Sequence, residues 1–84
     1  MQVILKHRAF DMDLLVREED NCWAFYMREA TDVAWQKIAT KGTKRDAQIA
    51  ACRYAQIQAG KDDGRRDACE ALLASWKEIS LEQV

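Results

Sequence analysis

Histidine and cysteine, the usual ligands of structural metal sites and frequent catalytic residues, are scarce in this 84-residue chain. His7 is the only histidine, and the three cysteines, Cys22, Cys52 and Cys69, form no CxxC pair. Structural zinc sites need paired ligands at short spacing, and a nucleophilic serine or cysteine needs a neighbouring base. The sequence also has no glycine-rich phosphate-binding loop. We therefore expect no metal, no cofactor, no catalytic residues and no enzymatic activity.

Long apolar runs are also absent. The apolar stretch near the start, residues 3–5, is shorter than the core of a signal peptide. Nothing approaches the ~20 apolar residues that a membrane-spanning helix needs. An odd number of cysteines cannot pair completely, which favours buried thiols in a reducing compartment. These features predict a soluble cytoplasmic protein without membrane contact.

The chain carries little net charge, because 13 Lys and Arg oppose 14 Asp and Glu to give −1. Nucleic-acid-binding modules are usually markedly basic, since their cations displace counterions from phosphates, and the net charge does not favour that class. A hydrophobic content of 49% argues against disorder, and the length suffices for one modest core. We expect a single domain over residues 1–84.

Alternating apolar and polar side chains predict two strands. In residues 9–17 the apolar members of the alternation are Phe10, Met12, Leu14 and Val16. Residues 19–21 make a polar break, and the alternation then resumes at Trp23, Phe25 and Met27. A two-residue turn pairs positions of opposite parity, so the even-numbered apolar set of the first strand is expected beside the odd-numbered set of the second.

A third strand is expected over residues 33–41, where Trp35 and Ile38 have opposite parity. If a tight turn places Ile38 inward beside Phe25, Trp35 points outward onto the face of Leu15 and Tyr26 and forms an aromatic patch. A three-residue turn or a bulge buries Trp35 instead. The sequence alone leaves both arrangements open.

Two helices are expected to follow. Thr43 and Asp46 have the spacing of a helix N-cap, and Gly60 is placed to end that helix. The apolar face of the first helix is predicted at Ala47, Ala50, Ala51, Tyr54 and Ile57. A second helix is predicted from Arg65 onward, with an apolar stripe at Cys69, Leu72, Leu73, Trp76 and Ile79.

Together these elements predict an α+β fold, in which two C-terminal helices pack on a three-stranded antiparallel sheet. Residues 1–8 form either the start of the first strand or a separate edge strand.

One segment resembles the C-terminal part of double-stranded-RNA-binding domains. The resemblance rests on Gly42, Thr43, Lys44, Arg45, Asp46, Ala47, Ala50, Ala51 and Ala55. It covers about the middle third of the chain and implies an alanine-rich helix packed on a three-stranded sheet. In that family, basic side chains at the start of this helix contact RNA phosphates, which implies the same role for Lys44 and Arg45.

The function we favour from the sequence is protein binding. Trp, Tyr and Arg are the residue types that dominate protein interfaces, and the predicted patch supplies them. The predicted partner-binding residues are Leu15, Tyr26, Arg28 and Trp35. By size and type the chain is similar to small accessory proteins of bacteriophages and mobile elements, including anti-CRISPR inhibitors. That similarity implies steric occlusion of a site on a host protein or protein complex.

The alternative function is binding of double-stranded RNA or DNA. Its predicted contact residues are Lys41, Lys44, Arg45, Arg65 and Arg66. Homodimerisation through an unpaired edge strand or the stripe around Trp76 is compatible with either function.

Overall fold

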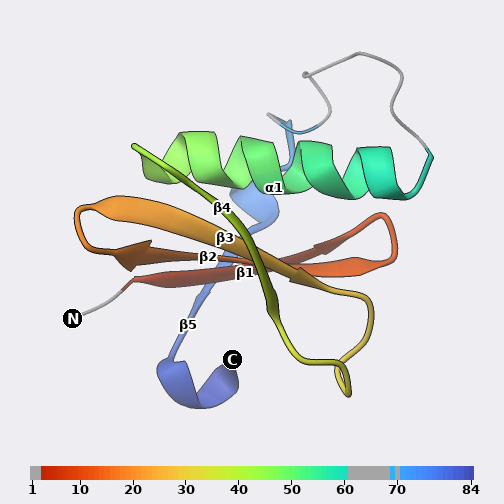
Figure 1. The fold of residues 1–84 in the computed structure, drawn as a ribbon, viewed down its shortest axis with the longest axis horizontal. Helices are drawn as coiled ribbons and strands as arrows, with labels where there is room; N and C mark the ends of the chain where they lie inside the picture. Colours follow the sequence, from red (N-terminus) through yellow and green to blue (C-terminus); the bar gives the residue numbers. More distant parts are fainter. Residues whose placement is uncertain (1–2, 61–68, 70) are drawn as a thin grey trace.

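The computed structural model has an α+β fold and describes residues 3–60, 69 and 71–84. In this part of the chain, five strands form one antiparallel sheet in the order β4-β3-β2-β1-β5. The strands are β1 (Ile4–Ala9), β2 (Met12–Glu19), β3 (Cys22–Arg28), β4 (Gln36–Lys41) and β5 (Lys77–Ile79). The helix α1 (Lys44–Gln58) lies across one face of the sheet (Figure 1). Two short 3-10 turns, η1 (Leu73–Ser75) and η2 (Leu81–Gln83), flank β5.

Two-residue turns join β1 to β2 and β2 to β3. All four turn residues, Phe10, Asp11, Asp20 and Asn21, have positive φ. Turns of this kind match the right-handed twist of the strands that they connect. The β2–β3 register pairs Val16 with Phe25, which confirms the predicted parity. The first strand predicted over residues 9–17 is wrong at its start, because the turn separates β1 from β2 there.

A bulge between β3 and β4 decides the positions of Trp35 and Ile38. The register shifts between Phe25 and Tyr26, so that Ile38 is the extra residue of β4. Ile38 packs against the core on the side of α1. Trp35 instead lies beside Arg28, whose guanidinium carbon is 4.0 Å from the centre of the Trp35 ring. A bulge is therefore present, but it turns Ile38 inward and leaves Trp35 half-buried on the other side of the sheet.

The predicted start and end of α1 are confirmed. The Thr43 side-chain oxygen accepts a hydrogen bond of 3.1 Å from the backbone N–H of Asp46. Gly60 follows the helix with a φ of 69°. Three alanines of α1 are fully buried against the sheet: Ala47, Ala51 and Ala55. The prediction that Ile57 belongs to the buried face is wrong, since that side chain is 54% exposed.

The C-terminal segment differs from the predicted second helix. Residues 61–68 and 70, which include Arg65 and Arg66, lie outside the described residues. The part from Leu73 to Ile79 is a 3-10 turn followed by the strand β5, so the helix predicted through Ile79 is wrong. Pairing of β5 with β1 satisfies backbone groups at the edge of β1 and draws Trp76 into the core. The predicted three-stranded sheet is corrected to five strands in the described part.

The core lies between the sheet and α1. The side chains of Phe25, Leu14 and Val16 lie on the face of the sheet toward α1, and Trp76 packs in the same cluster. Trp76 is only 8% exposed and faces the core, while Leu72, Leu73 and Ile79 of the predicted stripe are half-buried. A smaller cluster joins Ile49 and Cys52 of α1 to Cys69.

Candidate functional site

The sheet face opposite α1, here called the open face, is the candidate functional site. Strand pairing places fifteen side chains on it: Ile4, Lys6, Arg8, Asp13, Leu15, Arg17, Glu19, Cys22, Ala24, Tyr26, Arg28, Lys37, Thr40, Lys77 and Ile79. Among the helical segments that the structure describes, only α1 packs broadly on the sheet, and it does so from the other side (Figure 1). In the part of the chain that the structure describes, no long helix covers the open face.

Positive charge is concentrated on the open face. Its strand residues include six basic side chains and two acidic ones, which leaves four positive charges. The whole chain, in contrast, has a net charge of −1. The acidic residues are thus segregated away from this face, and a surface of this kind attracts anionic groups.

Asp13 is the centre of the first ion-pair cluster on the open face. Its carboxylate oxygens lie 2.8 Å from Nη1 of Arg8 and 3.0 Å from Nε of Arg28. The side chain of Asp13 is 5% exposed and that of Arg28 is 9% exposed. Burial alone would raise the pKa of Asp13, but the hydrogen bonds and charges of Arg8 and Arg28 outweigh it and lower that pKa. Arg28 is fixed further by stacking on Trp35.

Glu19 is the centre of the second cluster. It accepts hydrogen bonds from the Tyr26 hydroxyl and from Nζ of Lys37, the latter at 2.9 Å. Nε of Arg17 lies 3.1 Å from the same carboxylate. The hydrogen bonds from Tyr26 and Lys37 lower the pKa of Glu19. Burial and the bond to Glu19 raise the pKa of Tyr26.

Three buried apolar side chains lie under this charged layer, and the first is Ile4, which pairs with Arg17 and is 2% exposed. Leu15 is 2% exposed and Ala24 is fully buried, although no described helix covers their side of the sheet. Their strand neighbours on this face include Lys6, Arg17 and Tyr26, whose long side chains have apolar stems. The charged layer therefore also shields apolar surface from water.

The four predicted partner-binding residues do lie on one side of the sheet. Leu15, Tyr26 and Arg28 share the open face by register, and Trp35 joins them through its contact with Arg28. Leu15 is buried, however, so the prediction that it forms part of an exposed patch is wrong. Of the other three residues, Tyr26 and Trp35 are half-buried, and the side chain of Arg28 is 9% exposed.

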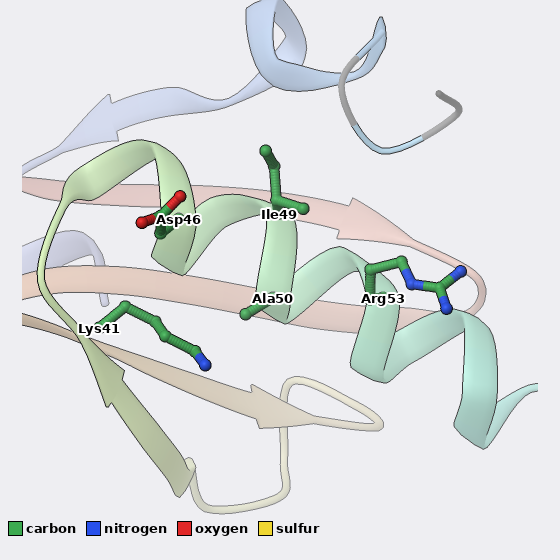
Figure 2. A pocket seen from close by; sticks show the side chains of 5 residues that line it. All are labelled: Lys41, Asp46, Ile49, Ala50 and Arg53. Atoms are coloured by element: carbon green, nitrogen blue, oxygen red, sulfur yellow. The ribbon is translucent and has the colours of Figure 1, made fainter. Parts of the chain in front are cut away.

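The residues predicted to bind nucleic acid lie elsewhere. Lys44 and Arg45 are exposed in the first turn of α1. Lys41, at the end of β4, lines a hollow of about 270 Å³ with Asp46, Ile49, Ala50 and Arg53. Figure 2 shows Lys41 extending from β4 toward α1. Lys41 and Arg53 against Asp46 leave one positive charge at this hollow, so it attracts phosphate less than the open face, which has an excess of four.

Sequence reasoning missed most of the cations of the open face. Lys6 and Arg8 alternate with Leu5 and His7 in β1, and this period of two was the available signal. This alternation assigns Lys6 and Arg8 to a face of the sheet only if residues 1–8 are known to form a strand. Lys77 had no such signal, because it was assigned to a helix.

The described residues also include three free thiols. Cys52 and Cys69 are fully buried free thiols, and Cys22 is half-buried. Burial, followed by a hydrogen bond with Cys69, raises the pKa of the Cys52 thiol to about 12. Among the described residues, no three His, Cys, Asp or Glu side chains are grouped so that they could hold a metal ion. No helix in that part of the chain is long and apolar enough to cross a membrane.

Acid should destabilise the protein through the two carboxylates of the open face. The ordinary pKa values are 3.8 for Asp13 and 4.5 for Glu19, and both are lowered in the folded state. Below those ordinary values the unfolded chain takes up protons that the folded chain does not, so the free energy of unfolding falls as pH falls through the folded pKa values. Urea unfolding at neutral pH and at about pH 3 measures this difference. The double variant Asp13→Asn, Glu19→Gln should show a smaller difference, and an unchanged one would contradict the assignment.

Comparison of the chain with models of protein families, with curated proteins and with solved structures gave no match.

Proposed function

We propose that this protein is a non-enzymatic binding module whose open face docks on an acidic surface of a protein partner. Docking blocks that surface by steric occlusion, in the manner of a phage-type, anti-CRISPR-like inhibitor. The observation that carries the proposal is the excess of four positive charges on one face of a chain whose net charge is −1. Complementary charge of this kind steers association and selects the partner.

The ion-pair clusters support the proposal because they hold the contact side chains in place. Arg28 is fixed between Asp13 and Trp35, and Arg17 is held beside Glu19. Long side chains that are already ordered lose less conformational entropy when a partner binds. Arginine, tyrosine and tryptophan are also the residue types that contribute most to protein interfaces.

The shape and the rim of the open face favour a protein over a nucleic acid. Five strands at a spacing of about 4.8 Å are about 19 Å wide, which exceeds the ~12 Å width of the DNA major groove. Exposed acidic residues stand at both ends of the strands, with Asp20 at one end and Glu29 and Asp32 at the other. A nucleic-acid backbone leaving the face would meet these carboxylates, whereas an acidic protein patch of limited size would not.

Nucleic-acid binding is the second candidate function. It is favoured by Lys44 and Arg45, which are exposed at the N-terminus of α1, where the resemblance to double-stranded-RNA-binding domains implies phosphate contacts. This candidate predicts that duplex RNA or DNA shifts the amide signals of residues 43–47 and that the shifts fade with added salt.

Site-specific photo-cross-linking tests the protein-binding proposal. A benzophenone side chain replaces Thr40, which is exposed on the open face, or Gln58, which is exposed at the end of α1. In host-cell lysate we expect a discrete protein adduct from position 40 and none from position 58. Lys37→Glu should reduce the adduct about tenfold, while Lys44→Glu, the same charge change on α1, should leave it unchanged.

Three outcomes of this experiment would contradict the proposal. They are an adduct with nucleic acid instead of protein, equal labelling from positions 40 and 58, and equal sensitivity to Lys37→Glu and Lys44→Glu. Labelling of nucleic acid together with salt-sensitive shifts at residues 43–47 would establish the second candidate instead.

A further inference from the structure

Two lysines face each other where β1 pairs with β5. Lys6 is directly opposite Lys77 in the antiparallel register, so both side chains lie on the open face. Like charges in directly opposed positions destabilise a sheet. On its other side Lys6 is paired with Leu15, and neither lysine forms an ion pair with a described residue. The repulsion between them is thus not balanced by a carboxylate in the described part of the chain.

A hollow of about 280 Å³, here called the edge hollow, lies at this place. It is lined by Lys6, His7, Arg8, Ser75 and Lys77. The pairing of β1 with β5 stops at Lys6, which leaves the following residues of β1 as an unpaired edge beside the hollow. Four of the five lining residues have basic side chains, the fifth is a serine, and no carboxylate is among them.

His7 adds an unpartnered polar atom. The imidazole interacts with the Ser75 backbone, and its buried Nε2 atom has no hydrogen bond within the geometric limits among the described residues. The ring packs against Trp76 with 5.3 Å between the ring centres. A buried nitrogen without a partner is unfavourable, and an oxygen or hydroxyl group of a ligand beside His7 would supply that partner.

We infer that the edge hollow binds the phosphate group of a small molecule, either inorganic phosphate or a phosphate monoester. A dianion placed between Lys6 and Lys77 replaces their repulsion with two attractions. Arg8 uses Nη1 for Asp13, and its remaining N–H groups can donate to phosphate oxygens. The hollow is slightly smaller than the ~300–1,000 Å³ typical of pockets for drug-sized ligands, which suits a small anion. The inference does not rest on the proposed protein partner.

Titration of the labelled protein with inorganic phosphate, glucose 6-phosphate and acetate at constant ionic strength tests the inference. We expect saturable shifts of the amide signals of Lys6, His7 and Lys77 with the first two ligands and no saturable shift with acetate. Equal affinities for the first two would show that the phosphate group alone is recognised. Tighter binding of glucose 6-phosphate would identify a monoester as the ligand.

A pair of matched variants completes the test. Lys77→Gln should lower phosphate affinity about tenfold, while Lys44→Gln on α1 should leave it unchanged. In phosphate-free buffer Lys77→Gln should not lower the thermal midpoint, because it relieves the repulsion with Lys6. Equal binding of acetate, or phosphate affinity unaffected by Lys77→Gln, would overturn the inference. The photo-cross-linking experiment probes β4, at the opposite edge of the sheet from β5, and measures a protein adduct. The titration measures phosphate binding beside β1 and β5, so either proposal can fail without the other.

Discussion

Replacing Asp13 with alanine is expected to lower the free energy of unfolding by about 3 kcal/mol, because it breaks a buried ion pair. Asp13 is 5% exposed, and its removal leaves the Arg28 guanidinium, 9% exposed, without the carboxylate that it now contacts. Arg8 contributes less to this loss, since its side chain is 56% exposed and can be hydrated. Equilibrium urea unfolding of the variant and the parent protein measures the difference.

Two further variants separate charge from shape at Asp13. Asp13→Asn keeps the side-chain shape and loses the charge, so its effect should lie between those of the parent and Asp13→Ala. Asp32→Ala removes an exposed carboxylate and should change the free energy of unfolding by less than about 0.5 kcal/mol. If Asp13→Ala and Asp32→Ala have equal effects, the cluster does not stabilise the open face.

The second large effect is expected from Phe25→Ala, which should lower the free energy of unfolding by about 3–4 kcal/mol. Phe25 is 4% exposed and belongs to the cluster between the sheet and α1. Truncation removes its contacts with the helix side of the core and leaves a cavity beside the β3–β4 bulge, where the backbone is already irregular. Thermal and urea unfolding both measure this loss.

Ile57→Ala is the matched control for Phe25→Ala, because it also truncates a large apolar side chain. Ile57 is 54% exposed, and the change should cost less than about 0.5 kcal/mol. A larger effect from Ile57 than from Phe25 would mean that α1 presents a different face to the sheet.

The elements that could be predicted from the sequence are those with local signals. The β2–β3 hairpin follows from its period-two alternation and its polar turn, and α1 follows from Thr43 and Gly60. The β1–β2 turn has no such signal. Phe10 and Asp11 both adopt positive φ, although neither is a glycine. Phe10 also continues the apolar alternation of β2, so the sequence pattern does not separate the turn from the strand.

The candidate site could be predicted only in part, because it depends on strands that are assembled over long distances in the sequence. Tyr26 and Arg28 were placed on their face by the hairpin register alone. Lys6 and Lys77 meet only when the first strand pairs with the last, and the helical spacing before β5 gives no hint of that pairing. The charge of the open face is likewise hidden in a net charge of −1, since segregation of charge does not change the total.

The pairing of β1 with β5 also has a consequence for how the chain folds. The β1–β2 and β2–β3 hairpins and β4 join residues that are close in the sequence, so they can assemble from local contacts. Adding β5 closes a loop of chain between Lys6 and Lys77 that includes α1. The chain loses conformational entropy when this loop closes, before the contacts of β5 with β1 compensate for the loss. During synthesis, an emerging chain can form the hairpins first. The edge of β1, and with it the edge hollow, stays open until residues 77–79 have left the ribosome.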